Sequence, residues 1–211
     1  METAAGRRFA IATALAGLTG CAATFSESQC SANDWYATGY SDGSTGHHAS
    51  RLVQRGGACL EHGVVPDRPQ YAAGWNDGIQ AFCTRENGFT VGESGASYER
   101  VCPASLEADF REGYSRGHAV FVAEYEVSRL ESAIDKRSAR IREMQHQMQY
   151  AVDVLTAPDT ATTDRLFLLE RTKSLSEEQG RLRAEIERLN AELADKRIRL
   201  EALRQTLAYG S

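Results

Sequence analysis

The sequence predicts a mainly α-helical protein, in which a small disulfide-bonded body with glycine–aromatic repeats and a short β-hairpin precedes a long antiparallel coiled-coil helical hairpin. Two patterns support this fold class. A glycine and aromatic motif recurs within residues 33–119, and apolar residues follow at three- and four-residue steps over residues 120–208. Both spacings are those of helix faces, and a repeat period of 35–39 residues is typical of small helical units.

The composition is that of an ordinary globular protein and excludes some functions. Of the 211 residues, 42% are apolar and 25% are charged, and the formal net charge is −5. No basic block or interleaved basic and aromatic surface is present, so we expect no nucleic-acid partner.

The N-terminus predicts export and a lipid anchor. Arg7 and Arg8 precede an apolar run over residues 9–18, which is typical of a signal peptide at residues 1–20. The following Leu18-Thr19-Gly20-Cys21 resembles the lipobox of bacterial lipoproteins, which implies that Cys21 is lipidated. A simple secretory signal is the alternative, but it would not require a cysteine.

The same resemblance implies where the protein works. Ala22, rather than Asp, follows Cys21, and the sorting rules of such lipoproteins then imply an outer-membrane anchor and a periplasmic orientation. Residues 21–32 would form a short linker between the anchor and the body. No later segment has the roughly 18 apolar residues that a membrane-spanning helix needs.

Four further cysteines, Cys30, Cys59, Cys83 and Cys102, predict two disulfides, because their number is even and the expected compartment is oxidising. A metal site is the alternative, but the spacings match no zinc module. We expect no metal and no cofactor.

Helix geometry ranks the possible disulfide pairings. If residues 33–55 form one helix, its flanking cysteines lie roughly 30 Å apart, whereas a disulfide needs Cα atoms within about 7 Å. If that helix and a second one at residues 68–82 are antiparallel, Cys30 meets Cys83 at one end. The expected pairs are therefore Cys30–Cys83 and Cys59–Cys102.

The repeated motif reads aromatic-x-x-Gly-aromatic-x-x-Gly. Its positions share one helix face, on which each glycine costs about 1 kcal/mol relative to alanine. We therefore expect a tight three-helix packing, in which aromatic rings fill the notches that glycines leave on a neighbouring helix. The helix-packing residues are Tyr36, Gly39, Tyr40, Gly43, Tyr71, Gly74, Trp75, Gly78, Phe110, Gly113, Tyr114 and Gly117.

The alternative is that the glycines open space for a ligand. Asp42 and Asp77 precede the second glycine of two repeats, and His47 follows the first repeat, so these three define a speculative polar site. The structural explanation is that the aspartates are solvated, form caps, or pair with Arg116, which takes the equivalent position in the third repeat.

Residues 88–102 predict the short β-hairpin. Phe89, Val91, Tyr98 and Val101 surround central glycines, and Pro103 follows.

Much of the body resembles a known family. Its spaced glycine, cysteine and aromatic positions are similar over residues 30–125 to the Gram-negative lipoproteins grouped as domain-of-unknown-function family 2799. The resemblance implies an envelope lipoprotein with a helical tail and implies no activity. The positions that carry it are Asp34-Trp35-Tyr36, Gly39-Tyr40, Asp42-Gly43, Cys59, His62, Pro66-Asp67, Tyr71, Gly74, Gly78, Cys83, Gly92, Gly95, Tyr98 and Val101-Cys102-Pro103.

Two heptad runs predict the hairpin, with its turn near residues 157–163 around Pro158. Polar residues interrupt the apolar seam at Arg137, Thr172, Gln179 and Lys196. The seam closes within the chain or also pairs between chains. The apolar seam positions are Val127, Leu130, Ile134, Ile141, Met144, Met148, Ala151 and Leu155, then Leu168, Leu175, Leu182, Ile186, Leu189, Leu193, Leu200, Leu203 and Leu207.

No nucleophile–base pair, metal triad or phosphate loop is present, so we expect no enzyme. We expect an envelope lipoprotein that serves as a structural or protein-interaction scaffold, with a protein partner or self-association through the coiled coil and a membrane contact through the lipid. The alternative is a module of the body that binds glycan or cell wall. It requires exposed Trp35, Tyr40 or Trp75, whereas the scaffold requires these rings to be buried.

Overall fold

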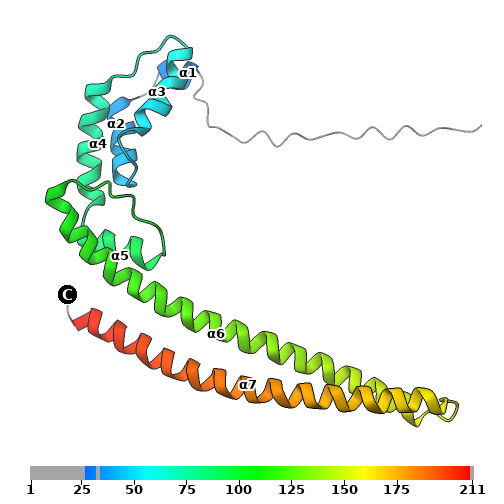
Figure 1. Cartoon of the computed structure of the whole chain (residues 1–211). Coiled ribbons are helices and arrows are strands. Elements are labelled where there is room, and N and C mark those ends of the chain that lie inside the picture. Colours follow the sequence, from blue (N-terminus) through cyan, green and yellow to red (C-terminus); the bar gives the residue numbers. More distant parts are fainter. Residues whose placement is uncertain (1–26, 32–33, 210–211) are drawn as a thin grey trace, which may run out of the picture.

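The structure, a computed structural model, describes residues 27–31 and 34–209. All regular structure among them is helical, and no strand occurs there (Figure 1). An upright body carries a long two-helix arm. The helices are α1 (Glu27–Ser31), α2 (Trp35–Ser44), α3 (Arg51–Glu61), α4 (Arg68–Phe82), α5 (Arg85–Glu93), α6 (Ala104–Thr156) and α7 (Thr162–Tyr209).

Helices α2 and α4 form a parallel pair that meets through glycine. A Cβ atom at Gly39 would lie 2.1 Å from the Tyr71 carbonyl oxygen, and one at Gly74 would lie 1.9 Å from that of Tyr36. One turn further along, Gly43 and Gly78 repeat the contact in the same direction. The two backbones touch, as small residues at four-residue spacing allow.

Helices α5 and α6 form a second pair with the same geometry. A Cβ atom at Gly88 would lie 2.2 Å from the Phe110 carbonyl oxygen, and one at Gly113 would lie 1.9 Å from the Arg85 carbonyl oxygen. Gly92 and Gly117 continue this contact. The predicted β-hairpin at residues 88–102 is therefore wrong, because its first half is α5, a fourth copy of the glycine motif.

The expected three-helix packing is also wrong, since the four copies form two separate parallel pairs. A glycine notch receives the neighbouring helix's carbonyl rather than an aromatic ring. The rings instead pack around the contacts: Tyr71 and Phe110 are buried, whereas Tyr36 and Tyr40 are exposed. The backbone contact is reciprocal, so every glycine of a pair is needed.

The helix predicted at residues 33–55 is broken. Helix α2 ends at Ser44, and Gly46 then adopts a φ of +73°, which lets the chain turn back into α3. Asp34 caps α2 by accepting a hydrogen bond from the Ala37 N–H, and Asp67 does the same for α4 through the Gln70 N–H.

Because the chain turns back after α2, the cysteines pair differently from the prediction. The four cysteines form two bridges, but the predicted pairing is wrong: the bridges are Cys30–Cys59 and Cys83–Cys102, with Cα atoms 5.4 and 5.7 Å apart. Because α2 and α4 are parallel, the connecting segment must return to the starting end, and it brings Cys59 back to Cys30. The loop after α5 returns Cys102 to Cys83 in the same way.

The second helix pair repeats the first beyond its glycines. Gly46 lies under the ring of Phe82, and Gly95, also at φ +73°, lies under that of Phe121. The Trp75 Nε1–H donates to the His47 carbonyl at 2.8 Å, and the Tyr114 hydroxyl donates to the equivalent Ala96 carbonyl at 3.0 Å. The body is a tandem duplication of one unit.

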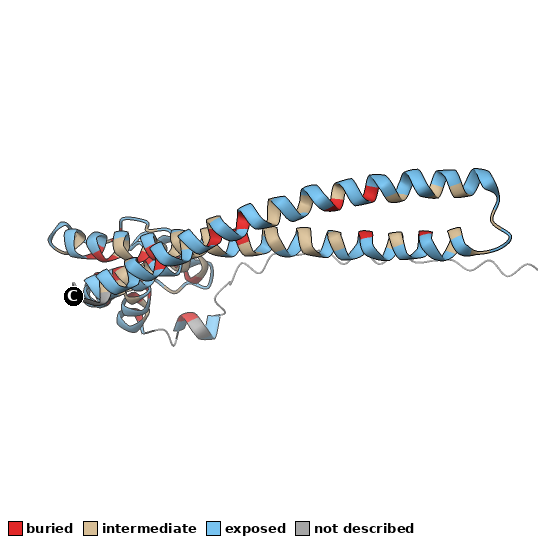
Figure 2. Ribbon diagram, turned by 90° about the horizontal axis from the view of Figure 1, so that it is seen from below, coloured by how far each residue is buried: buried red, intermediate tan, exposed pale blue. Residues whose placement is uncertain are grey.

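Helix α6 belongs to both parts of the molecule. It begins in the second glycine pair and continues, without a break at residue 120, into the first arm of the hairpin. Helix α7 runs back antiparallel to it, and the C-terminal end returns towards the body (Figure 1). The buried residues line the facing sides of the two helices (Figure 2).

The predicted seam is confirmed, since none of its positions is exposed. Leu130, Leu189 and Leu193 form a buried cluster at its base. The two charged seam residues are paired across the hairpin: Arg137 Nε lies 2.6 Å from Glu185 Oε2, and Lys196 Nζ lies 2.6 Å from a Glu126 oxygen. The seam therefore closes within one chain.

Candidate functional site

Asp42 is a buried carboxylate at the heart of the first helix pair. It is 1% exposed. Arg55 Nη2 lies 2.8 Å from its Oδ1, and the Tyr71 hydroxyl donates to its Oδ2 at 2.9 Å. Burial and this hydrogen bond hold the pKa of Tyr71 above its ordinary range. With its oxygens bonded by protein groups, Asp42 locks α3 and α4 onto α2.

The other two residues of the predicted polar site lie apart from this carboxylate. Asp77 is exposed and accepts a 2.7 Å hydrogen bond from the Tyr36 hydroxyl. His47 is exposed, and its carbonyl binds Trp75. Among the described residues, no group of three His, Cys, Asp or Glu side chains could hold a metal ion.

Arg116 does not pair with an aspartate. Its Nη1 lies 3.9 Å from Glu112, and its Nη2 donates to the Leu207 carbonyl at 3.4 Å. This second bond ties the end of α7 to the body.

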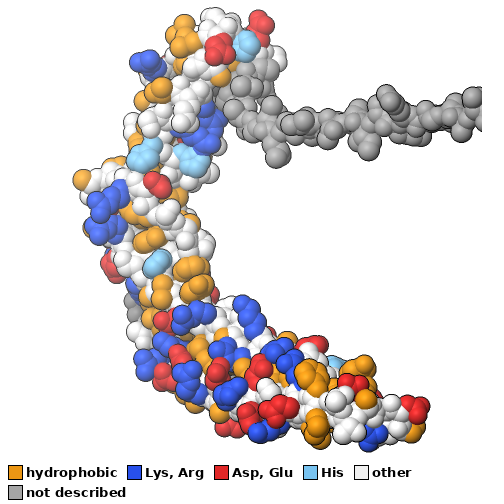
Figure 3. Space-filling model, turned by 45° about the vertical axis from the view of Figure 1, so that its right-hand side comes forward, with side chains coloured by type: hydrophobic (Ala, Val, Ile, Leu, Met, Phe, Trp, Pro, Cys, Tyr) orange, Lys and Arg blue, Asp and Glu red, His pale blue; other side chains and the backbone are white. Residues whose placement is uncertain are grey.

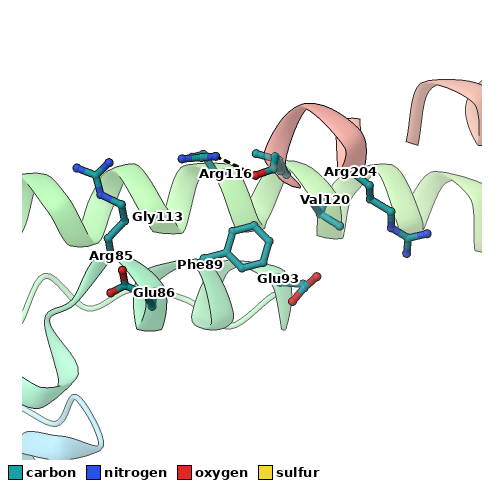
Figure 4. A pocket seen from close by; sticks show the side chains of 9 residues that line it. Arg85, Glu86, Phe89, Glu93, Gly113, Arg116, Val120 and Arg204 are labelled. Atoms are coloured by element: carbon teal, nitrogen blue, oxygen red, sulfur yellow. Dashed lines mark hydrogen bonds between the residues drawn. The ribbon is translucent and has the colours of Figure 1, made fainter. Parts of the chain in front are cut away.

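A cavity of about 420 Å³ lies beside this tie (Figure 4). Phe89 of α5 points into it between α5 and α6, and Val120 and Leu207 add apolar walls. Two of the arginines that line it are paired with carboxylates outside the cavity: Arg85 with Asp109 and Glu112, and Arg204 with Glu124. The cavity lies where α5 of the body meets α6 and the end of α7.

The aromatic residues that a glycan site requires differ in their exposure to solvent. Trp35 is buried at 7% exposure, and Trp75 is half-buried with its indole N–H bonded to protein. Tyr40 is 43% exposed. A continuous stacking platform of these three rings is therefore not formed.

The free end of the hairpin exposes apolar side chains. Phe167 is 71% exposed, Tyr150 is 68% exposed, and Leu166 is 64% exposed; Leu169 and Val152 are also exposed. We call these five residues the tip patch. A shallow cavity of about 360 Å³, lined by Tyr150, Leu168 and Leu175, adjoins it.

Sequence reasoning missed the tip patch although a signal was present. The run Leu166-Phe167-Leu168-Leu169 is apolar on all sides of the helix, whereas the seam uses only Leu168. A helical turn that is apolar all round is ordinarily buried. The fourth glycine copy was missed because Arg85 stands where the other copies have an aromatic residue.

The predicted signal peptide, Cys21 and most of the linker at residues 21–32 lie outside the described residues. No helix among residues 27–31 and 34–209 is both long and apolar enough to cross a membrane.

The comparisons bear on the body alone. No curated protein and no solved structure matches the chain. A family model described as a protein of unknown function, DUF2799, matches residues 34–119. These residues span both glycine pairs, and the match ends where α6 leaves the body for the arm. Over these residues the duplicated body is similar to this family.

Proposed function

We propose that the protein is a non-enzymatic envelope lipoprotein that works as a scaffold, with a rigid body near the membrane and a helical arm that engages a protein partner. The arm is the observation that carries this proposal. The apolar positions of its seam are covered within the chain and its charged positions are paired, so the hairpin closes without a partner. Its free end nevertheless exposes apolar residues.

The arm has the dimensions of a spacer. About 36 residues of α6 lie beyond the body, and at 1.5 Å per residue they extend roughly 50 Å. Cross-helix ion pairs between Arg197 and Glu131 and between Arg140 and Glu178 add to the apolar seam. A stiff arm of this length holds its tip at a fixed distance from the body.

The lipid anchor is part of the proposal. Cys21 would place the acyl chains nine residues before Cys30, the first disulfide cysteine, so the body would lie close to the outer membrane on its periplasmic side. Cys21→Ser should move the protein from the membrane to the soluble periplasmic fraction, because a protein without its acyl chains loses its hydrophobic anchor. Retention of the variant in outer-membrane fractions would contradict the anchor.

Binding of glycan by the body is the weaker alternative. It retains the exposed Tyr40 and Tyr36 but not Trp35, which is buried. Sedimentation of the protein with purified peptidoglycan tests it. Binding that is lost in Tyr40→Ala and kept when the arm is shortened would favour this alternative over the scaffold.

A shortened arm tests the scaffold. Residues 141–181 form the distal half of the hairpin, with its turn, and a short Gly-Asn turn can replace them. The basal cluster of Leu130, Leu189 and Leu193 stays intact in this shortened chain. Both forms are cross-linked in cells and purified. We expect the full chain to capture a discrete protein partner and the shortened chain to lose it.

The control is the fold of the shortened protein. Its body should keep both disulfides and its helical circular dichroism. Capture of the same partner at the same yield by the shortened chain would show that the arm is not the binding element.

A further inference from the structure

The start of α7 presents more apolar surface than the hairpin can cover. Successive helical residues are about 100° apart, so Leu166, Phe167 and Leu169 project in different directions around the helix. Their exposed fractions are 64%, 71% and 55%. Exposed runs of apolar residues are unfavourable in a free protein and mark an interaction site.

The same region is acidic. Within residues 150–170, four exposed carboxylates accompany a single basic residue, Arg165. The Arg165 guanidinium is occupied by the turn, since it donates to the carbonyls of Ala157 and Thr160 at 2.9 and 3.1 Å. The carboxylates are those of Asp153, Asp159, Asp164 and Glu170.

Most basic side chains lie closer to the body. Arg171 is the exception, because it lines the cavity beside Tyr150, where it donates to Gln147 Oε1 at 3.4 Å. Residues 171–207 carry nine Lys and Arg against seven Asp and Glu. Figure 3 shows hydrophobic side chains among charged ones towards the free end, and Lys and Arg interspersed with Asp and Glu closer to the body. The tip thus differs from the shaft in both polarity and charge.

We propose that the tip patch is the docking surface for a segment of a different protein that is apolar on one face and rich in Lys and Arg beside it. This inference rests on the proposed scaffold function and names the chemistry of its partner. Apolar contact with Phe167, Leu166 and Tyr150 supplies the affinity, and the surrounding carboxylates select a basic segment and speed its approach.

Charge disfavours other occupants. A second copy would bring the same four carboxylates to a tip-to-tip contact, and the body would bring eleven Asp and Glu against seven Arg over residues 34–119. An anionic lipid surface would be repelled as well.

Site-specific photo-crosslinking in the native cell tests the proposal on the full chain. The probe is p-benzoylphenylalanine, placed at Phe167 in one variant and at Ile198 in another. Ile198 is the matched control, because it is 70% exposed on the shaft of the same helix. We expect position 167, and not position 198, to cross-link to another protein, and the mapped peptide to be apolar with more Lys and Arg than Asp and Glu.

Two further variants separate the contributions. Leu166→Ser with Leu169→Ser, in the chain carrying the probe at 167, should lower the cross-link yield by at least about tenfold through lost apolar contact. Asp153→Asn with Asp164→Asn should lower it roughly fivefold at low salt and less at high salt.

Other outcomes overturn the inference. Cross-links from position 167 to lipid, to a second copy of the chain or to an acidic peptide contradict the proposed partner, as do equal yields at positions 167 and 198. If the shortened arm loses its partner while the tip variants keep it, the tip inference fails and the scaffold stands. If the shortened arm keeps its partner, both fail.

Discussion

At the scale of single residues, glycine sets the distance between helices in the body. Eight glycines at the two contacts each face a neighbouring backbone that cannot move aside as a side chain can. Their conformational cost in a helix, about 1 kcal/mol each, is offset by the close packing of two whole backbones and of the rings around them.

Substitution of one such glycine should separate its helix pair. For Gly74→Ala, whose Cβ would lie 1.9 Å from the Tyr36 oxygen, we expect the free energy of unfolding to fall by at least about 2 kcal/mol. Urea unfolding measures it. Gly180→Ala is the matched control: nothing lies within 4 Å of its Cβ, so the helix should gain about 1 kcal/mol. Equal stability of Gly74→Ala and the wild type would contradict the contact.

The duplicated units also differ by matched residue exchanges. The first unit has Tyr71 and Asp42, which hydrogen-bond to each other, whereas the equivalent positions of the second unit hold Phe110 and Val91. The first unit therefore has a hydroxyl paired with a carboxylate, and the second unit has two apolar side chains at the same two positions. Burying either polar group alone would leave it without its partner, which costs about 1–3 kcal/mol.

Tyr98 predicts a loss of stability at alkaline pH. Burial and its hydrogen bond to Glu107 raise the pKa of Tyr98 to about 12. Because the folded state holds this proton more tightly than the unfolded chain, the stabilisation is complete below about pH 10 and is lost as the pH rises towards 12. Absorbance at 295 nm should show late-ionising tyrosines, and Tyr98→Phe should remove the contribution near pH 12 while that of Tyr71, whose pKa is also raised, remains. An unchanged titration curve in that variant would contradict the assignment.

At the scale of elements, the hairpin could be predicted from the sequence and the body only in part. The seam of α6 and α7 follows from spacing along the helix, which is a local property. The direction in which α2 packs on α4 does not, because a Gly-x-x-x-Gly face accepts a partner of either polarity. The parallel arrangement decides which cysteines meet, and for this reason the predicted pairing was wrong.

The observed pairing can be tested by removing one bridge cleanly. In a chain that carries Cys21→Ser, Cys83→Ser with Cys102→Ser should leave no free thiol and lower the free energy of unfolding by about 3 kcal/mol, since a loop of this size loses its closure. Thiol titration and urea unfolding measure the two effects. Two free thiols in this variant would indicate the crossed pairing instead.

One polar residue weakens the seam between α6 and α7. Gln179 is buried at 9% exposure, and its Nε2 has no hydrogen-bond partner in the part of the chain that the structure describes. Gln179→Leu should raise the free energy of unfolding by about 1–2 kcal/mol, because it removes an unsatisfied buried amide. Thermal unfolding measures it, with the exposed Ile198→Leu as control. A destabilised variant would show that Gln179 has a partner in solution.

At the scale of the whole molecule, the family boundary and the architecture agree. The match at residues 34–119 covers both duplicated units and stops within α6, so the matched region ends where the body ends and the arm begins on the same helix. Helix α6 is continuous, and Arg116 binds the end of α7 to it. The arm is therefore attached to the body through both of its helices.

This architecture predicts that the arm can be shortened only in register. Removal of residues 134–140 together with residues 182–188 takes one heptad from each facing helix, so Ile141 replaces Ile134 and Leu189 replaces Leu182 in the seam. The hairpin should stay closed and shorten by about 10 Å.

Removal of residues 134–140 alone should leave the tip of α7 without its facing partners and lower the free energy of unfolding by several kcal/mol, as loss of buried leucine contacts does. Small-angle scattering measures the length, and urea unfolding measures the stability. If the single and the paired deletion were equally stable, the two helices would not be held by the seam. If the paired deletion were stable but lost its protein partner, the fixed reach of the arm would be required for binding, as a spacer demands.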